Sequence, residues 1–185
     1  MSKKIIGIHG IREREKNDFY ATPPEAVELF LDNFKLKGTI LEPSCGMGHI
    51  SEVLKSEGYD VISKDLIDRG YGITGCDFMN ETETYDTVIT NPPFKIAKEF
   101  VEKGLEVANH QVIMLLKLQF LESEARRDFF ANTPLKEIYV HSKRIACWKG
   151  GEPLNEKGKK WAGTQAYAWF VWEHGYKGEP TIRWI

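Results

Sequence analysis

The chain has 185 residues, of which 42% are hydrophobic, 12% aromatic and 28% charged, and its formal net charge is −2. These values predict a single domain with a hydrophobic core, and they exclude a disordered chain or one divided into two large domains. The charge is unevenly placed, because residues 1–116 have 13 basic and 19 acidic side chains whereas residues 117–185 have 12 and 8. This asymmetry is equally compatible with a polyanion that contacts one side of the domain and with a solvated loop that has a chance excess of lysine.

Short apolar segments typical of strands alternate with amphipathic helical patterns along most of the chain. We predict helices over about residues 23–34, 48–56, 95–108 and 121–130. Thr22 is the expected N-cap of the first helix, since prolines occupy its first turn and Glu25 follows three residues later. We predict seven strands, at about residues 39–41, 60–63, 72–76, 87–90, 112–116, 137–141 and 167–172.

This alternation predicts an α/β fold with a seven-stranded, mostly parallel, doubly wound sheet. The first five strands are expected to be parallel and joined by right-handed crossovers. No helical pattern separates the last two strands, so we expect them to be antiparallel. Residues 1–185 form one domain in this interpretation, with residues 1–18 as an N-terminal arm. Ligands bind such sheets at the carboxyl ends of the strands, which places the chemistry in the loops that follow them.

The sequence predicts no metal, no disulfide and no membrane segment. Cys45, Cys76 and Cys147 are widely spaced, and the five histidines show no metal-binding spacing. The longest apolar run, residues 112–116, is far shorter than the roughly 20 residues of a membrane helix. The N-terminal sequence MSKKIIGIHG breaks its apolar run too early for a signal peptide. We therefore expect a soluble cytoplasmic protein with reduced thiols.

The loop after the first predicted strand contains the sequence EPSCGMG. Its two glycines, Gly46 and Gly48, allow the backbone to pass close beneath a ligand at the start of a helix. This pattern alone is equally compatible with a tight turn, and Ser51 stands where a dinucleotide fingerprint has its third glycine. An acidic residue at the strand end, Glu42, disfavours a pyrophosphate and favours a ligand that carries a positive charge.

Acidic side chains follow two further strands. Asp65, with Leu66 after it, ends the second strand, where a carboxylate can accept hydrogen bonds from both hydroxyls of a ribose. Asp77 and Phe78 follow the third strand, where an acid could bind an adenine amino group and a ring could pack on the base. Each of these residues alone is as well explained by a solvated strand end. Their succession in three strand-end loops favours a nucleotide-like ligand.

Asn91-Pro92-Pro93-Phe94 directly follows a predicted strand and is the most specific motif of the chain. Two successive prolines make this loop rigid and extended. The side-chain carbonyl of Asn91 and the main-chain carbonyl of Pro92 are then two fixed acceptors beside the flat face of Phe94. A planar NH2 group stacked on that ring could donate one hydrogen to each acceptor. A simple turn would explain the prolines but not the asparagine.

EPSCGMG, Asp65, CDF and NPPF occur in an order and spacing that resembles the S-adenosylmethionine-dependent N6-adenine DNA methyltransferases, and most closely the short phage and prophage forms. The sequence FYATP, residues 19–23, resembles the N-terminal motif with which those enzymes hold the methionine end of the cofactor. The resemblance covers residues 19–172. It implies a seven-stranded Rossmann-like sheet with an antiparallel last strand, S-adenosyl-L-methionine as cofactor, and a bacterial or phage-infected host cell.

The resemblance also implies residue roles. The catalytic residues would be Asn91, Pro92, Pro93 and Phe94. The cofactor would contact Tyr20, Thr22, Glu42, Pro43, Gly46, Gly48, Asp65, Leu66, Asp77, Phe78 and Asn91.

Larger members of this family read a defined DNA site with a separate domain, for which this chain has no room. The connection over residues 145–165 is the candidate that remains, because it is basic and contains Trp148 and Trp161. Basic residues interleaved with aromatics suit contacts with a nucleic acid, whereas Trp169 and Trp172 lie in a predicted strand, and at least one of them is expected in the core. The expected nucleic-acid contacts are Lys143, Arg144, Trp148, Lys157, Lys159, Lys160 and Trp161.

The expected reaction transfers the cofactor's methyl group to the N6 amine of adenine in DNA, with relaxed or short sequence specificity. It requires an adenine flipped out of the duplex but no metal. Several alternatives stay open: adenine in RNA, N4 of cytosine, a glutamine amide in a protein, a non-catalytic nucleotide-binding module, or a dehydrogenase. Glutamine-modifying relatives usually have tyrosine at the position of Phe94 and an added N-terminal domain. The chain is compatible with a monomer or a homodimer.

Overall fold

The structure, a computed structural model, describes residues 19–185; the predicted N-terminal arm lies outside the described residues. Ten strands are assigned in the described part of the chain: β1 (Tyr20–Ala21), β2 (Ile40–Glu42), β3 (Val61–Asp65), β4 (Ile73–Thr74), β5 (Tyr85–Thr90), β6 (Ala108–Lys117), β7 (Leu135–Val140), β8 (Trp148–Lys149), β9 (Tyr167–Glu173) and β10 (Thr181–Trp184). The helices are α1 (Pro24–Leu31), α2 (His49–Ser56), α3 (Ala97–Val107) and α4 (Arg127–Ala131).

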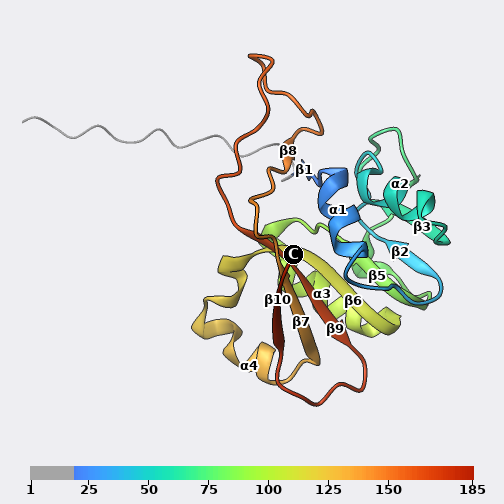
Figure 1. Ribbon diagram of the computed structural model, residues 1–185. Helices are drawn as coiled ribbons and strands as arrows, with labels where there is room; N and C mark the ends of the chain where they lie inside the picture. The colour runs from blue at the N-terminus through green and yellow to red at the C-terminus, as the bar shows by residue number, and fades with distance from the viewer. Residues whose placement is uncertain (1–18) are drawn as a thin grey trace, which may run out of the picture.

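One main sheet organises the domain, with the strand order β10-β7-β9-β6-β5-β2-β3-β4 (Figure 1). Strands β2, β3, β4, β5 and β6 pair in parallel, and β9 runs antiparallel to both β6 and β7. The predicted α/β class, the parallel first five strands and the antiparallel β7–β9 pair are confirmed. From β2 the chain adds β3 and β4 on one side of that strand, and it then crosses over to form β5 on the other side of β2. This reversal opens a cleft at the carboxyl ends of β2 and β5.

Helices cover both faces of the sheet. On one face, α1 and α2 contribute Phe30 and Leu54 to a core that also contains the fully buried Trp169. On the other face, α3 and α4 pack Phe100 and Phe129 against a core that contains the fully buried Trp172. Because successive residues of β9 point to opposite faces, this one strand supplies a tryptophan to each layer. Both tryptophans therefore fill the core, where the sequence predicts at least one of them.

The predicted helix over residues 121–130 is wrong in its first half. Only α4 is α-helical, and two short 3-10 turns, Leu118–Leu121 and Glu124–Arg126, precede it. The guanidinium of Arg126 donates hydrogen bonds to the carbonyls of Phe120, Gln119 and Glu122. These carbonyls are held by a side chain instead of by the amides of a continuous helix. The local hydrogen bonds thus replace the first turns of the expected helix.

The sheet has one more strand than predicted. The edge strand β10 pairs in parallel with β7, so the antiparallel strand β9 is not the last strand of the chain. All four residues of β10 are exposed, which removes the alternation of buried and exposed positions that reveals a strand in the sequence. The two-residue strands β1 and β8, which pair with each other, are too short to show any periodicity.

The predicted N-cap of α1 is also wrong. The residue in that position is Pro23, and no side chain caps the helix. Thr22 precedes it, and its hydroxyl oxygen accepts a hydrogen bond from the side chain of Asn91, 69 residues away. A tertiary contact therefore uses the group that we expected to cap the helix.

Candidate active site

Two cavities lie at the carboxyl ends of the central strands. The first has a volume of about 470 Å³ and is lined by the ends of β2 and β3, the loop after β5, and β1. Of the residues predicted from the sequence, it is lined by Tyr20, Thr22, Glu42, Pro43, Asp65, Leu66, Asp77, Phe78, Asn91 and Pro93. The structure therefore brings together side chains from five separate stretches of the chain, and their contact with a cofactor stays a prediction.

Gly46 and Gly48 do not line this cavity, but their backbone shapes the loop that does. Gly46 has a φ of 58°, and a Cβ atom there would lie 2.5 Å from the ring of Phe19. Gly48 has a φ of 86°, and a Cβ atom there would lie 2.6 Å from the ring of Tyr71. Both positions require glycine for conformation and for space. The loop then enters α2, with Gly48 as N-cap residue.

Asp65 holds the glycine loop in place. Its carboxylate, only 5% exposed, accepts hydrogen bonds from the backbone N–H groups of Gly46, at 2.8 Å, and Ile67, at 2.7 Å. It also accepts a hydrogen bond from Nη1 of Arg69 at 3.1 Å. Arg69 in turn places its guanidinium 4.4 Å from the ring centroid of Phe19. Both oxygens of Asp65 thus have partners within the chain, and its predicted contact with a ribose stays a prediction.

Glu42 is a buried acid in the wall of the first cavity. Its side chain accepts hydrogen bonds from the backbone N–H of Ser51, at 2.9 Å, and from the Ser51 hydroxyl. That hydroxyl lies 2.6 Å from the hydroxyl of Ser63. Burial raises the pKa of Glu42 to about 8, although the hydrogen bonds from Ser51 oppose the shift. Within residues 19–185 no basic side chain forms an ion pair with Glu42, so a cationic group in the cavity would be its natural partner.

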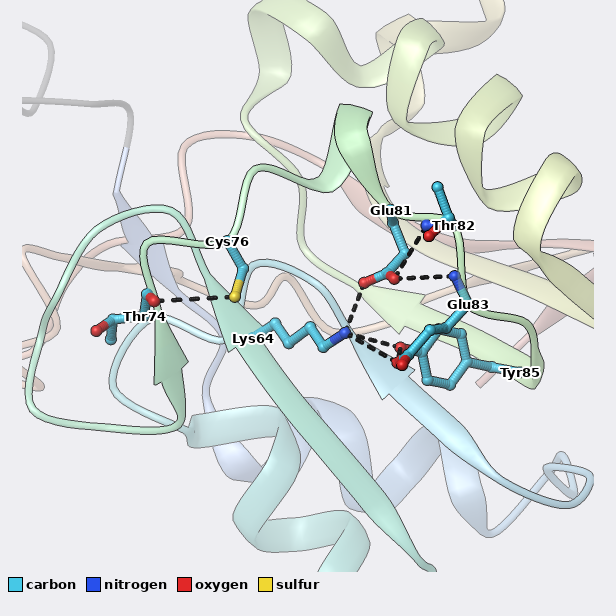
Figure 2. A network of polar contacts seen from close by, with 7 residues as sticks. All are labelled: Lys64, Thr74, Cys76, Glu81, Thr82, Glu83 and Tyr85. Atoms are coloured by element: carbon cyan, nitrogen blue, oxygen red, sulfur yellow. Dashed lines mark hydrogen bonds and ion pairs between the residues drawn. The ribbon is translucent and has the colours of Figure 1, made fainter.

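A clasp formed by Lys64, Glu81, Glu83 and Tyr85 ties the loop after β4 to β3 (Figure 2). Nζ of Lys64 lies 2.7 Å from Glu81 Oε2, 2.9 Å from the Tyr85 hydroxyl and 3.4 Å from Glu83 Oε2. Burial acts to lower the pKa of Lys64, but the hydrogen bonds to Glu81 and Tyr85 outweigh it and raise that pKa. Lys64 therefore remains charged at neutral pH, and the clasp fixes the end of the loop that leads into β5.

The clasped loop carries Asp77 and Phe78 to the first cavity. Asp77 Oδ1 accepts a hydrogen bond from the backbone N–H of Met79 at 3.0 Å and so caps a short 3-10 turn. Phe78 is 5% exposed and packs against Phe100, with the ring centroids 5.1 Å apart. Both residues line the cavity. Phe78 is mostly a core residue, and only part of its ring is available to a ligand.

The loop Asn91-Pro92-Pro93-Phe94 stands between the two cavities. Nδ2 of Asn91 donates hydrogen bonds to the main-chain oxygen of Tyr20, at 2.7 Å, and to Oγ1 of Thr22, at 3.1 Å. Its Oδ1 accepts no hydrogen bond from residues 19–185. Pro92 is buried and lines neither cavity, whereas Pro93 lines the first and Phe94 the second. Asn91 lines the first cavity, so its free acceptor belongs to that cavity, whereas Phe94, three residues later, lines the second.

The second cavity has a volume of about 740 Å³ and an aromatic and basic lining. The ring of Phe94 stacks with that of Tyr20 at 6.4 Å, packs near Tyr167 at 5.9 Å, and has Nζ of Lys117 at 4.4 Å from its centroid. Tyr20 lines both cavities. The lysines in the lining are Lys117, Lys149, Lys157, Lys159 and Lys160. Such a lining suits a flat ring attached to an anionic group.

The predicted nucleic-acid residues divide into two groups. Lys157, Lys159, Lys160 and Trp161 line the second cavity, and Trp161 donates a hydrogen bond to the main-chain oxygen of Glu152 at 2.6 Å. The other three do not line it: Lys143 and Arg144 are exposed, and Trp148 packs edge-on against His49, at 5.4 Å, beside the first cavity.

Sequence reasoning missed several lining residues. In the second cavity they include Lys117, Lys149 and Tyr167, which come from three different strands. In the first they include Arg69 and His49. One signal was available for Lys117, because it is the first polar residue after a buried apolar run and therefore marks a strand end beside the predicted site.

In the part of the chain that the structure describes, no group of His, Cys, Asp and Glu could hold a metal ion. None of the described helices is both long and apolar enough to cross a membrane.

Comparisons with known proteins identify the fold. No protein-family model and no curated protein matches the chain. Among solved structures, a proposed RNA methyltransferase from Pyrococcus horikoshii is 16% identical with a TM-score of 0.63, covering 83% of this chain and 86% of its own. The magnesium protoporphyrin IX methyltransferase of Synechocystis, crystallised with S-adenosylhomocysteine, is 15% identical with a TM-score of 0.54, covering 81% and 82%.

A third similar structure is an S-adenosylmethionine-dependent O-methyltransferase from Thermotoga maritima, 14% identical with a TM-score of 0.54, covering 84% of this chain and 66% of its own. The chain has the Rossmann-like methyltransferase fold. At these identities the likeness establishes the fold alone. Two of these proteins are named for different substrates, RNA and magnesium protoporphyrin IX, so the shared fold does not define the substrate of this chain.

Proposed function

We propose that this protein transfers a methyl group from S-adenosyl-L-methionine to the N6 amine of adenine in DNA, as the NPPF-type amino-methyltransferases do. The observation that carries the proposal is the Asn91 side chain in the wall of the first cavity, three residues before Phe94 in the wall of the second. Both hydrogens of its amide are bound within the chain, and its oxygen is left as an acceptor. A carbonyl acceptor suits a hydrogen-bond donor such as an NH2 group and does not suit a carbon centre.

The first cavity fits the cofactor by its shape and its acids. Its volume of about 470 Å³ is within the range typical of small-molecule sites. The cofactor carries a cationic amino group and a sulfonium, and Glu42 is a buried carboxyl without an ion-pair partner in the described chain. Asp65, Leu66, Asp77 and Phe78 would surround the ribose and the adenine. When bound, the cofactor supplies an electrophilic methyl group on its sulfonium sulfur.

The chain's own contribution to the reaction is to orient the target amine. The lone pair of an aromatic amine is delocalised into the ring, which makes it a poor nucleophile. Asn91 Oδ1 and the main-chain oxygen of Pro92 would accept the two amine hydrogens, and these bonds strengthen as positive charge develops on the nitrogen. Phe94 would hold the ring by stacking, which is worth about 1–3 kcal/mol per base. This orients the nitrogen toward the first cavity.

The second cavity supports a nucleic acid as substrate. Aromatic rings at its floor and lysines around it match a flipped base and its flanking phosphates. Lysine contacts phosphate as a point charge and reads little sequence, which favours a relaxed or short recognition sequence. A bacterial or phage-infected cell is the expected setting, and a monomer or a homodimer is compatible with the proposal.

One experiment tests the substrate. The purified protein and methyl-labelled S-adenosylmethionine are incubated with DNA, with RNA or with a protein extract in three separate reactions. The modified nucleosides are then identified by mass spectrometry. Formation of N6-methyldeoxyadenosine by the wild type, and none by Asn91→Ala, supports the proposal. Label in RNA, on N4 of cytosine or in protein would assign one of the other amine acceptors. Binding of S-adenosylhomocysteine without any transfer would indicate a non-catalytic module, and binding of NAD instead would indicate a dehydrogenase.

A further inference from the structure

The orientation of the Asn91 amide is determined by the segment around β1. The main-chain oxygen of Tyr20 can only accept a hydrogen bond, so at 2.7 Å it requires the NH2 end of the amide to face it. Oγ1 of Thr22 accepts a second bond from the same nitrogen at 3.1 Å. Exchanging the amide oxygen for its nitrogen would place two carbonyl oxygens against each other at the Tyr20 contact, so that contact fixes the orientation of the amide. This explains why Oδ1 is the end left for a ligand.

Thr22 is placed to act on Asn91 more directly than on a ligand. Its side chain is 2% exposed, and it does not cap the helix that follows it. β1 is itself fixed, because Ala21 pairs with Trp148 and Tyr20 with Lys149 in β8. The acceptor pair that holds the amide is thus anchored by backbone pairing.

We infer that Thr22 is a positioning residue for methyl transfer and not a cofactor ligand. Its hydroxyl oxygen and the Tyr20 carbonyl bind both hydrogens of Asn91 Nδ2, so that Oδ1 is presented to the target amine. The inference rests on the proposed function, and it departs from the sequence expectation that Thr22 contacts the cofactor. Without the hydroxyl, one Nδ2 hydrogen loses its partner at a part-buried site and the amide is free to tilt.

The test compares Thr22→Val, which keeps the side-chain shape, with Thr22→Ser, which keeps the hydroxyl. Thr90→Val is the matched control, because Thr90 precedes Asn91 and its hydroxyl is buried without a partner in the described chain. The affinity for S-adenosylhomocysteine is measured by calorimetry. The kcat for methyl transfer is measured at saturating concentrations of cofactor and DNA. Thr22→Ala is the second variant if valine disturbs folding.

We expect Thr22→Val to lower kcat roughly tenfold, the effect of about one hydrogen bond, with S-adenosylhomocysteine affinity unchanged within about twofold. Thr22→Ser should restore kcat, and Thr90→Val should match the wild type in both measurements. Weaker S-adenosylhomocysteine binding with an unchanged kcat would show instead that Thr22 is a cofactor ligand and would overturn the inference.

A readout independent of turnover separates this inference from the proposed function. In a ¹⁵N-labelled sample, both Nδ2 hydrogens of Asn91 should exchange slowly with solvent in the wild type and in Thr22→Ser, and at least one should exchange faster in Thr22→Val. Equal exchange in all three proteins would overturn the inference, whatever the activity. A wild-type protein that transfers no methyl group but shows this pattern would refute the proposed function while leaving the orientation of Asn91 established.

Discussion

Replacing Glu42 by glutamine tests the buried acid at the centre of the proposed cofactor site. Burial raises the pKa of this carboxyl from about 4.5 to about 8, so the folded chain holds a proton that the unfolded chain releases above about pH 4.5. The stabilisation from that proton is complete below the unfolded pKa and is lost as the pH rises through the folded pKa. Glutamine keeps the shape but cannot titrate.

The size of the effect follows from the width of this window. Stability changes by about 1.4 kcal/mol per pH unit for each proton that differs between the two states. Between about pH 5 and 7 the wild type should therefore lose about 2–3 kcal/mol relative to Glu42→Gln. For a chain of this length that corresponds to roughly 5–10 °C in Tm.

Thermal unfolding of both proteins at pH 5, 6 and 7 measures this difference. Burial lowers the pKa of His49 and lowers that of His141 to about 4, which gives a dependence of opposite sign, but both histidines are present in the two proteins and cancel in the comparison. We expect the Tm of Glu42→Gln to increase relative to that of the wild type as the pH rises. A difference in Tm that does not change with pH would refute the reasoning, because Glu42 would then not titrate in this range.

The same group predicts a proton change on ligand binding. A cationic amine in the first cavity favours ionised Glu42 and lowers its pKa, so at about pH 7 binding should release a proton. Calorimetry of S-adenosylhomocysteine in two buffers of different ionisation enthalpy measures this release. The wild type should release a proton, whereas Glu42→Gln should release none.

Three further variants test other parts of the site. Asn91→Ala should abolish methyl transfer and change S-adenosylhomocysteine affinity by less than about threefold; near-normal turnover would contradict the mechanism. Asp65→Ala leaves the N–H of Gly46 without its acceptor, so both Tm and S-adenosylhomocysteine affinity should fall, and a folded variant unchanged in both would remove Asp65 from the site. Replacing Lys157, Lys159 and Lys160 together by alanine should weaken DNA binding without changing which adenines are modified. The salt dependence of the binding constant should become less steep, by an amount that corresponds to the loss of up to about three phosphate contacts. Methylation mapped to one strict long site would contradict this.

Much of the fold and of the first cavity could be predicted from the sequence because both depend on local patterns. Buried apolar runs between turn residues define the central strands, and parallel strands place their carboxyl ends at one edge. That rule alone brings Glu42, Asp65 and Asn91 into one cavity, although they are far apart in the chain. The glycines at 46 and 48 were likewise predicted as conformational requirements, and their positive φ values agree.

The parts that could not be predicted depend on contacts without a local signal. Asn91 and Tyr20 are 71 residues apart, and β1, the strand that contains Tyr20, is only two residues long and shows no periodicity in the sequence. The role of Asp65 in holding the glycine loop depends on a backbone N–H, which any residue possesses. In the second cavity, composition identified the lysines of the long connection, but Lys117 and Tyr167 come from neighbouring strands of the sheet.

The pairing of β1 with β8 links the two cavities physically. Tyr20 lines both of them, and its carbonyl orients the Asn91 amide. Its partner in β8, Lys149, begins the basic connection whose lysines line the second cavity. A displacement of that connection would therefore move β1, and with it the acceptor that sets Asn91. The connection between β7 and β9 therefore supports the segment that orients the Asn91 amide, because it is joined to that segment through the β1–β8 pair.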